Sequence, residues 1–152
     1  MKINITNKQY LSLIKMVYLG NWMINAIRTG QKGDEYVKEY EDLEQYIYSF
    51  AKDYGMEKYI EFDKKMAQHF PTNEFEVNTD LNLRHEEYDE HTFWEELFYK
   101  LYERDMRNKY SPEEISKMTF EERIRLEEPF RQKWDKELEK YGVERLEIKE
   151  EN

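Results

Sequence analysis

The stretch 88–106 constrains the fold most, because its apolar residues recur at the spacing of an α-helix. The apolar side chains follow one another at steps of one to five residues: Phe93, Trp94, Leu97, Leu101 and Met106. Residues with this spacing lie on one face of a helix. The sequence therefore predicts a helix whose apolar face lies in the core, with the two large aromatic side chains at its start filling much of that core.

Candidate helix starts recur along the chain. A Ser, Thr or Asp that can cap a helix N-terminus precedes a helical pattern at five places: Thr6, Asp34, Asp89, Ser111 and Thr119. At Thr6, Ser111 and Thr119, a Gln or Glu three residues later completes a capping box. From these starts and the stripes that follow them, we expect a mostly α fold, a multi-helix bundle of about six or seven helices.

Two helices are expected between Asp34 and the stretch 88–106. A heptad seam of apolar residues runs from Tyr36 to Tyr54 and predicts one helix, which ends at Gly55. A further helix is expected over 57–69, with four residues turned inward: Tyr59, Phe62, Met66 and Phe70.

The two ends of the chain carry the only strand-like patterns. Apolar and polar residues alternate at Ile3–Ile5, and Val143–Ile148 has a similar character, so these segments are candidates for a short two-stranded pairing. No repeat or change in composition divides the sequence. Residues 1–148 are therefore predicted to form a single helical domain, followed by a polar C-terminal tail at 149–152.

The chain is strongly acidic, and its charge bounds its partners. It has 152 residues with 34 acidic and 24 basic side chains, a net charge of −10. Such a protein repels nucleic-acid phosphates, so direct nucleic-acid binding is not expected, whereas a basic protein surface is attracted. The chain has no cysteine, and its longest apolar region, Met16–Ile27, is too short and too polar to span a bilayer. We expect a cytosolic protein with no membrane partner.

A dense acidic run is the leading candidate for a binding surface. Six carboxylates fall within eleven positions: Glu86, Glu87, Asp89, Glu90, Glu95 and Glu96. The leading hypothesis is a protein-binding module of inhibitor or adaptor type, which has no catalytic activity and no cofactor and uses this run against a basic partner. A homodimer remains open.

Two other classes of function stay open. The 16% aromatic content could build a pocket for a small ligand or nucleotide, with arginines holding phosphate. A hydrolase could use a histidine–carboxylate site around 85–95, where His85, His91 and Glu95 are the candidates for metal ligands. Their spacing does not match the HExxH pattern, so no metal is expected.

Overall fold

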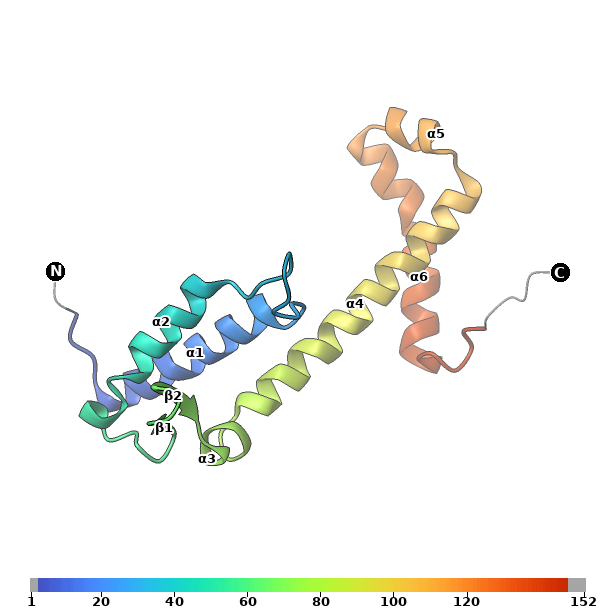
Figure 1. Ribbon diagram of the computed structural model, residues 1–152. Coiled ribbons are helices and arrows are strands. Elements are labelled where there is room, and N and C mark those ends of the chain that lie inside the picture. The colour runs from blue at the N-terminus through green and yellow to red at the C-terminus, as the bar shows by residue number, and fades with distance from the viewer. Residues whose placement is uncertain (1–2, 148–152) are drawn as a thin grey trace. The chain divides into compact units, whose positions relative to one another are not determined.

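A computed structural model describes residues 3–147, and within them 66% helix and one small antiparallel sheet define a mostly α fold. The elements are shown in Figure 1: α1 (Asn7–Asn25), α2 (Lys38–Tyr48), the 3₁₀-helix η1 (Ala51–Tyr54), β1 (Ile60–Asp63), β2 (Gln68–Pro71), α3 (Asn73–Val77), α4 (Leu81–Lys109), α5 (Pro112–Lys117) and α6 (Phe120–Tyr141). The chain forms two compact units, Met1–Glu86 and Glu87–Asn152. The predicted fold class is confirmed.

The three predicted capping boxes all form. The Thr6 hydroxyl accepts the Gln9 amide at 3.3 Å, and the Gln9 side chain accepts the Thr6 amide at 2.8 Å. The same reciprocal pairs start α5 at Ser111 and α6 at Thr119. Each box satisfies backbone donors that a helix start otherwise leaves without partners, so these helices begin where the sequence predicts.

The two predicted aspartate caps are wrong. Asp34 lies in the loop before α2, where its carboxylate accepts the amide and hydroxyl of Thr29, both at 2.9 Å. These hydrogen bonds hold the pKa of Asp34 below its usual range. Asp89 lies inside α4, which begins eight residues earlier at Leu81. A carboxylate before an apolar pattern is a local signal, and in both places longer-range structure decides the helix start instead.

The predicted helix over 57–69 is wrong, because this segment forms the hairpin of β1 and β2. The strands pair antiparallel, with Ile60 opposite Pro71 and Asp63 opposite Gln68. The Asp63 carboxylate accepts the amides of Lys65 at 2.6 Å and Met66 at 3.0 Å, which closes the turn. Phe62 and Met66, expected to face inward, are exposed.

The sheet therefore lies at 60–71 and not at the ends of the chain. Ile3–Ile5 has no regular secondary structure, and 143–147 is turn and irregular chain, so the proposed pairing of the two ends is wrong for the described residues. Ile148 and the predicted tail at 149–152 lie outside those residues. Strands of three to six residues gain little without a sheet to join.

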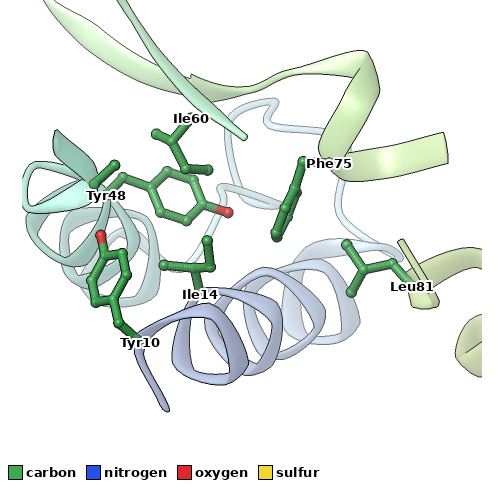
Figure 2. Packing of buried hydrophobic residues seen from close by; sticks show 7 residues of the cluster. Tyr10, Ile14, Tyr48, Ile60, Phe75 and Leu81 are labelled. Atoms are coloured by element: carbon green, nitrogen blue, oxygen red, sulfur yellow. The ribbon is translucent and has the colours of Figure 1, made fainter. Parts of the chain in front are cut away.

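The first unit packs around one apolar cluster (Figure 2). Its buried members come from α1, α2, η1, β1, α3 and the start of α4: Tyr10, Ile14, Tyr48, Ala51, Ile60, Phe75 and Leu81. The Tyr10 hydroxyl donates to the Ile47 carbonyl at 2.6 Å, and its ring stacks on Tyr54 at 4.3 Å. In Figure 1, α1 and α2 lie side by side, and this pairing forms one wall of the cluster.

The second unit has its own core between α4 and α6. Leu101, Tyr102 and Trp134 are buried there. The helix α6 continues through Pro129, where the sequence suggests a kink or a restart. Phe93, expected in the core, is 52% exposed, whereas Trp94 is only partly exposed. The buried residues of α4 in this unit are Leu101, Tyr102 and Met106, so neither of the two aromatic residues expected to fill the core belongs to it.

Candidate functional site

The predicted acidic run lies on α4, and all six carboxylates are exposed. They do not form one surface. Successive residues of an α-helix are rotated by about 100°, so Asp89 and Glu96 fall on one side and Glu87 and Glu95 on roughly the opposite side. Of the six, Glu95 lines a groove between α4 and α6.

This groove, called here the α4–α6 groove, lies within the second unit and has a volume of about 320 Å³. One wall comes from α4 and the other from α6. The lining residues are Trp94, Glu95, Phe98, Asp135, Leu138 and Glu139. Helical spacing explains the set, because side chains three or four positions apart point the same way. Each wall therefore carries both kinds of side chain: two aromatic rings and one carboxylate from α4, and one leucine and two carboxylates from α6.

The register of α6 is fixed by the residue that precedes Asp135. Trp134 is buried, and its indole nitrogen donates to the Asp105 carboxylate at 2.9 Å. The same carboxylate accepts Lys133 Nζ at 2.6 Å and Arg104 Nη2 at 3.0 Å. Burial opposes the charge of Asp105, but these hydrogen bonds outweigh it and hold the pKa of Asp105 below its usual range. With Trp134 anchored in the core, Asp135, Leu138 and Glu139 face the groove.

The carboxylates of the groove are only partly compensated. His91 Nε2 lies 3.6 Å from Glu95 Oε2, one helical turn away. Among the residues that the structure describes, no lysine or arginine nitrogen lies within 4.0 Å of the Asp135 or Glu139 carboxylate. Asp135 and Glu139 are therefore groove carboxylates without an ion pair to a lysine or arginine of residues 3–147.

The histidine candidates are brought together only in part. His91 and Glu95 meet as their spacing predicts, with side chains 70% and 59% exposed. His85 belongs to the first unit, where its ring meets that of Trp22 at 3.9 Å between centroids. Over 3–147, no group of three His, Cys, Asp or Glu side chains is arranged to hold a metal ion.

A second polar cluster joins α1 and α2 in the first unit. The Glu44 carboxylate accepts Tyr48 Oη at 3.2 Å and Asn21 Nδ2 at 3.0 Å. Burial raises the pKa of Glu44. Tyr18 likewise donates to Glu76 at 3.0 Å, and burial followed by this bond raises the pKa of Tyr18 to about 12. Both carboxylates are bound by side chains of the chain itself, which indicates a role in packing.

Sequence reasoning missed the α6 half of the groove. Asp135 and Glu139 lie on either side of Leu138 and carry the i, i+4 spacing of one helical face. That spacing was the available signal. The rotation of both helices decides which carboxylates of α4 and α6 line the same groove, and local sequence does not specify that rotation.

Fold and groove together define an acidic, mostly α-helical protein with an aromatic, carboxylate-lined groove. Comparison of the chain with protein-family models, curated proteins and solved structures gives no match. Across the described residues, the helices are too short or too polar for any of them to cross a membrane.

Proposed function

We propose that the protein is a cytosolic binding module of inhibitor or adaptor type that docks a basic segment of another protein in the α4–α6 groove. One observation carries the proposal. Three carboxylates and three apolar side chains line the groove, and two of the carboxylates, Asp135 and Glu139, have no lysine or arginine partner among the described residues. A basic side chain with an apolar stem complements both parts of such a groove.

Two physical effects favour this use. The net charge of −10 draws a basic partner toward the surface and speeds its encounter. Trp94 and Phe98 then supply aromatic surface, which often carries a large share of the binding free energy at protein interfaces. Charge sets the rate of association and the rings set the lifetime of the complex.

The groove gives less support to the other two classes. A nucleotide brings phosphates, which three carboxylates repel. A hydrolytic site needs an acid or base held away from bulk water, and His91 and Glu95 are mostly exposed. No feature of the groove favours a nucleotide-binding protein or a hydrolase over a protein that binds a basic segment.

The test is the binding of a fluorescein-labelled helical peptide of about 15 residues, long enough to populate a helix, with lysine and arginine on one face. Fluorescence anisotropy measures its Kd at low ionic strength. The variant Asp135→Asn/Glu139→Gln removes two carboxylates from the groove. We expect the Kd to rise about 5- to 30-fold, from about 0.5–1 kcal/mol for each lost ion pair.

The matched control is Glu90→Gln/Glu96→Gln, which changes the net charge equally on α4 but outside the groove. It should change the Kd by less than about twofold, since exposed charges that do not touch the ligand act mainly through screened, long-range attraction. Circular dichroism confirms that both variants fold. Equal losses in both variants would mean that charge alone attracts the peptide, and the groove proposal would fail.

A further inference from the structure

We infer that the groove selects arginine: the guanidinium of the docked segment lies against Trp94 and Phe98 and donates to Asp135 and Glu139. This inference rests on the proposed function and names the side chain that the groove binds. It follows from which groups form each wall, from the size of the groove, and from how the chain binds its own arginines.

The arrangement of the walls favours a planar cation. Trp94 and Phe98 lie one turn apart on α4, and Asp135 and Glu139 lie one turn apart on α6. A guanidinium is flat, weakly hydrated and carries five donors in a rigid fork. It can stack on aromatic rings with its face while its edge donates to two carboxylates. An ammonium is a compact, strongly hydrated charge that gains less from the rings.

The size of the groove suits one long side chain. Its volume of about 320 Å³ is at the lower end of the range of about 300–1,000 Å³ that is usual for small-molecule pockets. Leu138, which faces the same space, gives the methylene stem an apolar contact. In the proposed complex the backbone of the segment stays outside the groove and one side chain enters it.

The second unit already holds one of its own arginines, Arg145, against both a ring and a carboxylate. The Arg145 guanidinium lies 4.4 Å from the centroid of Tyr141, and its Nε lies 3.2 Å from a Glu137 carboxylate oxygen. Glu137 and Tyr141 are one turn apart on α6. Arg131 lies 5.5 Å from the centroid of Phe98, a ring that also lines the groove. On α6, therefore, an aromatic and an acidic side chain one turn apart hold the guanidinium of Arg145.

Lys133 shows where the selectivity arises. Its ammonium lies 4.6 Å from the Trp134 ring and 2.6 Å from the Asp105 carboxylate, so one ring and one carboxylate also suit lysine. The α4–α6 groove offers a pair of carboxylates on one wall. A guanidinium can donate to both carboxylates with separate N–H groups while its flat face stays on the rings, whereas an ammonium that donates to both keeps less contact with the rings.

The experiment compares three alanine-based helical peptides that differ at one central residue: arginine, lysine or citrulline, the neutral isostere of arginine. Anisotropy at low ionic strength should show arginine binding at least about threefold tighter than lysine, the size of a cation–π difference. Citrulline should show no saturable binding. Asp135→Asn/Glu139→Gln should remove the preference for arginine, and Glu90→Gln/Glu96→Gln should retain it.

Trp94→Leu should also reduce the preference for arginine over lysine. The melting temperature of this variant shows whether it folds. If it does not fold, Asp135→Asn/Glu139→Gln, which changes only exposed side chains, provides the test. Equal, groove-dependent affinity for arginine and lysine would overturn the arginine inference and leave the proposed function standing. Absence of binding by all three peptides would overturn both the arginine inference and the proposed function.

Two further results would identify another occupant of the groove. Equally tight binding of N-acetyl-arginine amide would identify a free cation as the occupant, and self-association abolished by Asp135→Asn/Glu139→Gln would identify a second copy of the chain. Either result overturns the inference.

Discussion

At the scale of single residues, the sharpest prediction concerns the contribution of Asp105 to the free energy of unfolding. Its carboxylate accepts the buried Trp134 indole, Lys133 and Arg104. Asp105→Ala leaves the Trp134 donor buried without this acceptor, so the free energy of unfolding should fall by about 1–3 kcal/mol. Urea denaturation measures the loss. Asp105→Asn, which keeps an acceptor and removes the charge, should lose less. Equal losses would mean that the hydrogen bond to Trp134 contributes nothing.

The same residue gives a pH dependence with a definite sign. Because the pKa of Asp105 is lowered in the folded protein, its stabilisation is present above the ordinary Asp pKa and is lost as pH falls through the lowered value. The stability difference between wild type and Asp105→Asn should therefore shrink below about pH 4, where even an unperturbed Asp takes up its proton. A difference that stays constant through acid pH would contradict this.

The candidate site shows what residue-level reasoning predicts and what it misses. The sequence predicts Glu95 as a candidate binding residue and as a candidate metal ligand with His91, and the proximity of these two side chains follows from the pitch of one helix alone. Asp135 and Glu139 were not named, although they supply the wall opposite Trp94. Their role depends on which faces of two helices meet, and that is decided by packing around Trp134.

At the scale of elements, sequence prediction succeeded where the deciding contacts are local. The boxes at Thr6, Ser111 and Thr119 close over three residues, and all three form. The hairpin at 60–71 was predicted as a helix, because apolar residues at steps of three and four also fit a helical face. Its strands gain their stability from pairing with each other and from burying Ile60 in the cluster of the first unit, contacts that a local window does not contain.

The capping box of α6 is the element-scale prediction. The Thr119 hydroxyl accepts the Glu122 amide at 3.3 Å, and the Glu122 side chain accepts the Thr119 amide at 2.9 Å. Thr119→Ala should cost about 0.5–2 kcal/mol of unfolding free energy, the usual range for a lost N-cap. Thr119→Ser keeps the hydroxyl and should stay within about 0.5 kcal/mol of wild type. If the two variants lose the same amount in urea denaturation, the cap does not stabilise α6.

At the scale of the whole molecule, the open question is how many cooperative units the chain contains. The sequence predicts one domain over 1–148, and that remains a prediction. The structure has two buried clusters, one around Tyr10 and Phe75 and one around Leu101 and Trp134, with no shared residue. Cooperativity requires contacts that unfold together, so separate clusters favour separate unfolding.

Native-state hydrogen exchange distinguishes the two cases, because it reports opening element by element. If the units open separately, Asp105→Ala should speed exchange in α6 by about 5- to 150-fold, which corresponds to about 1–3 kcal/mol, and leave α1 and α2 unchanged. Ile14→Ala, which truncates a fully buried side chain of α1, should do the reverse, since removing a buried branched side chain costs about 2–5 kcal/mol. The two variants serve as controls for each other, because each lies in one cluster. If either variant speeds exchange equally in α1 and α6, the chain opens as one cooperative domain, as its sequence predicts, and the independence of the two clusters is wrong.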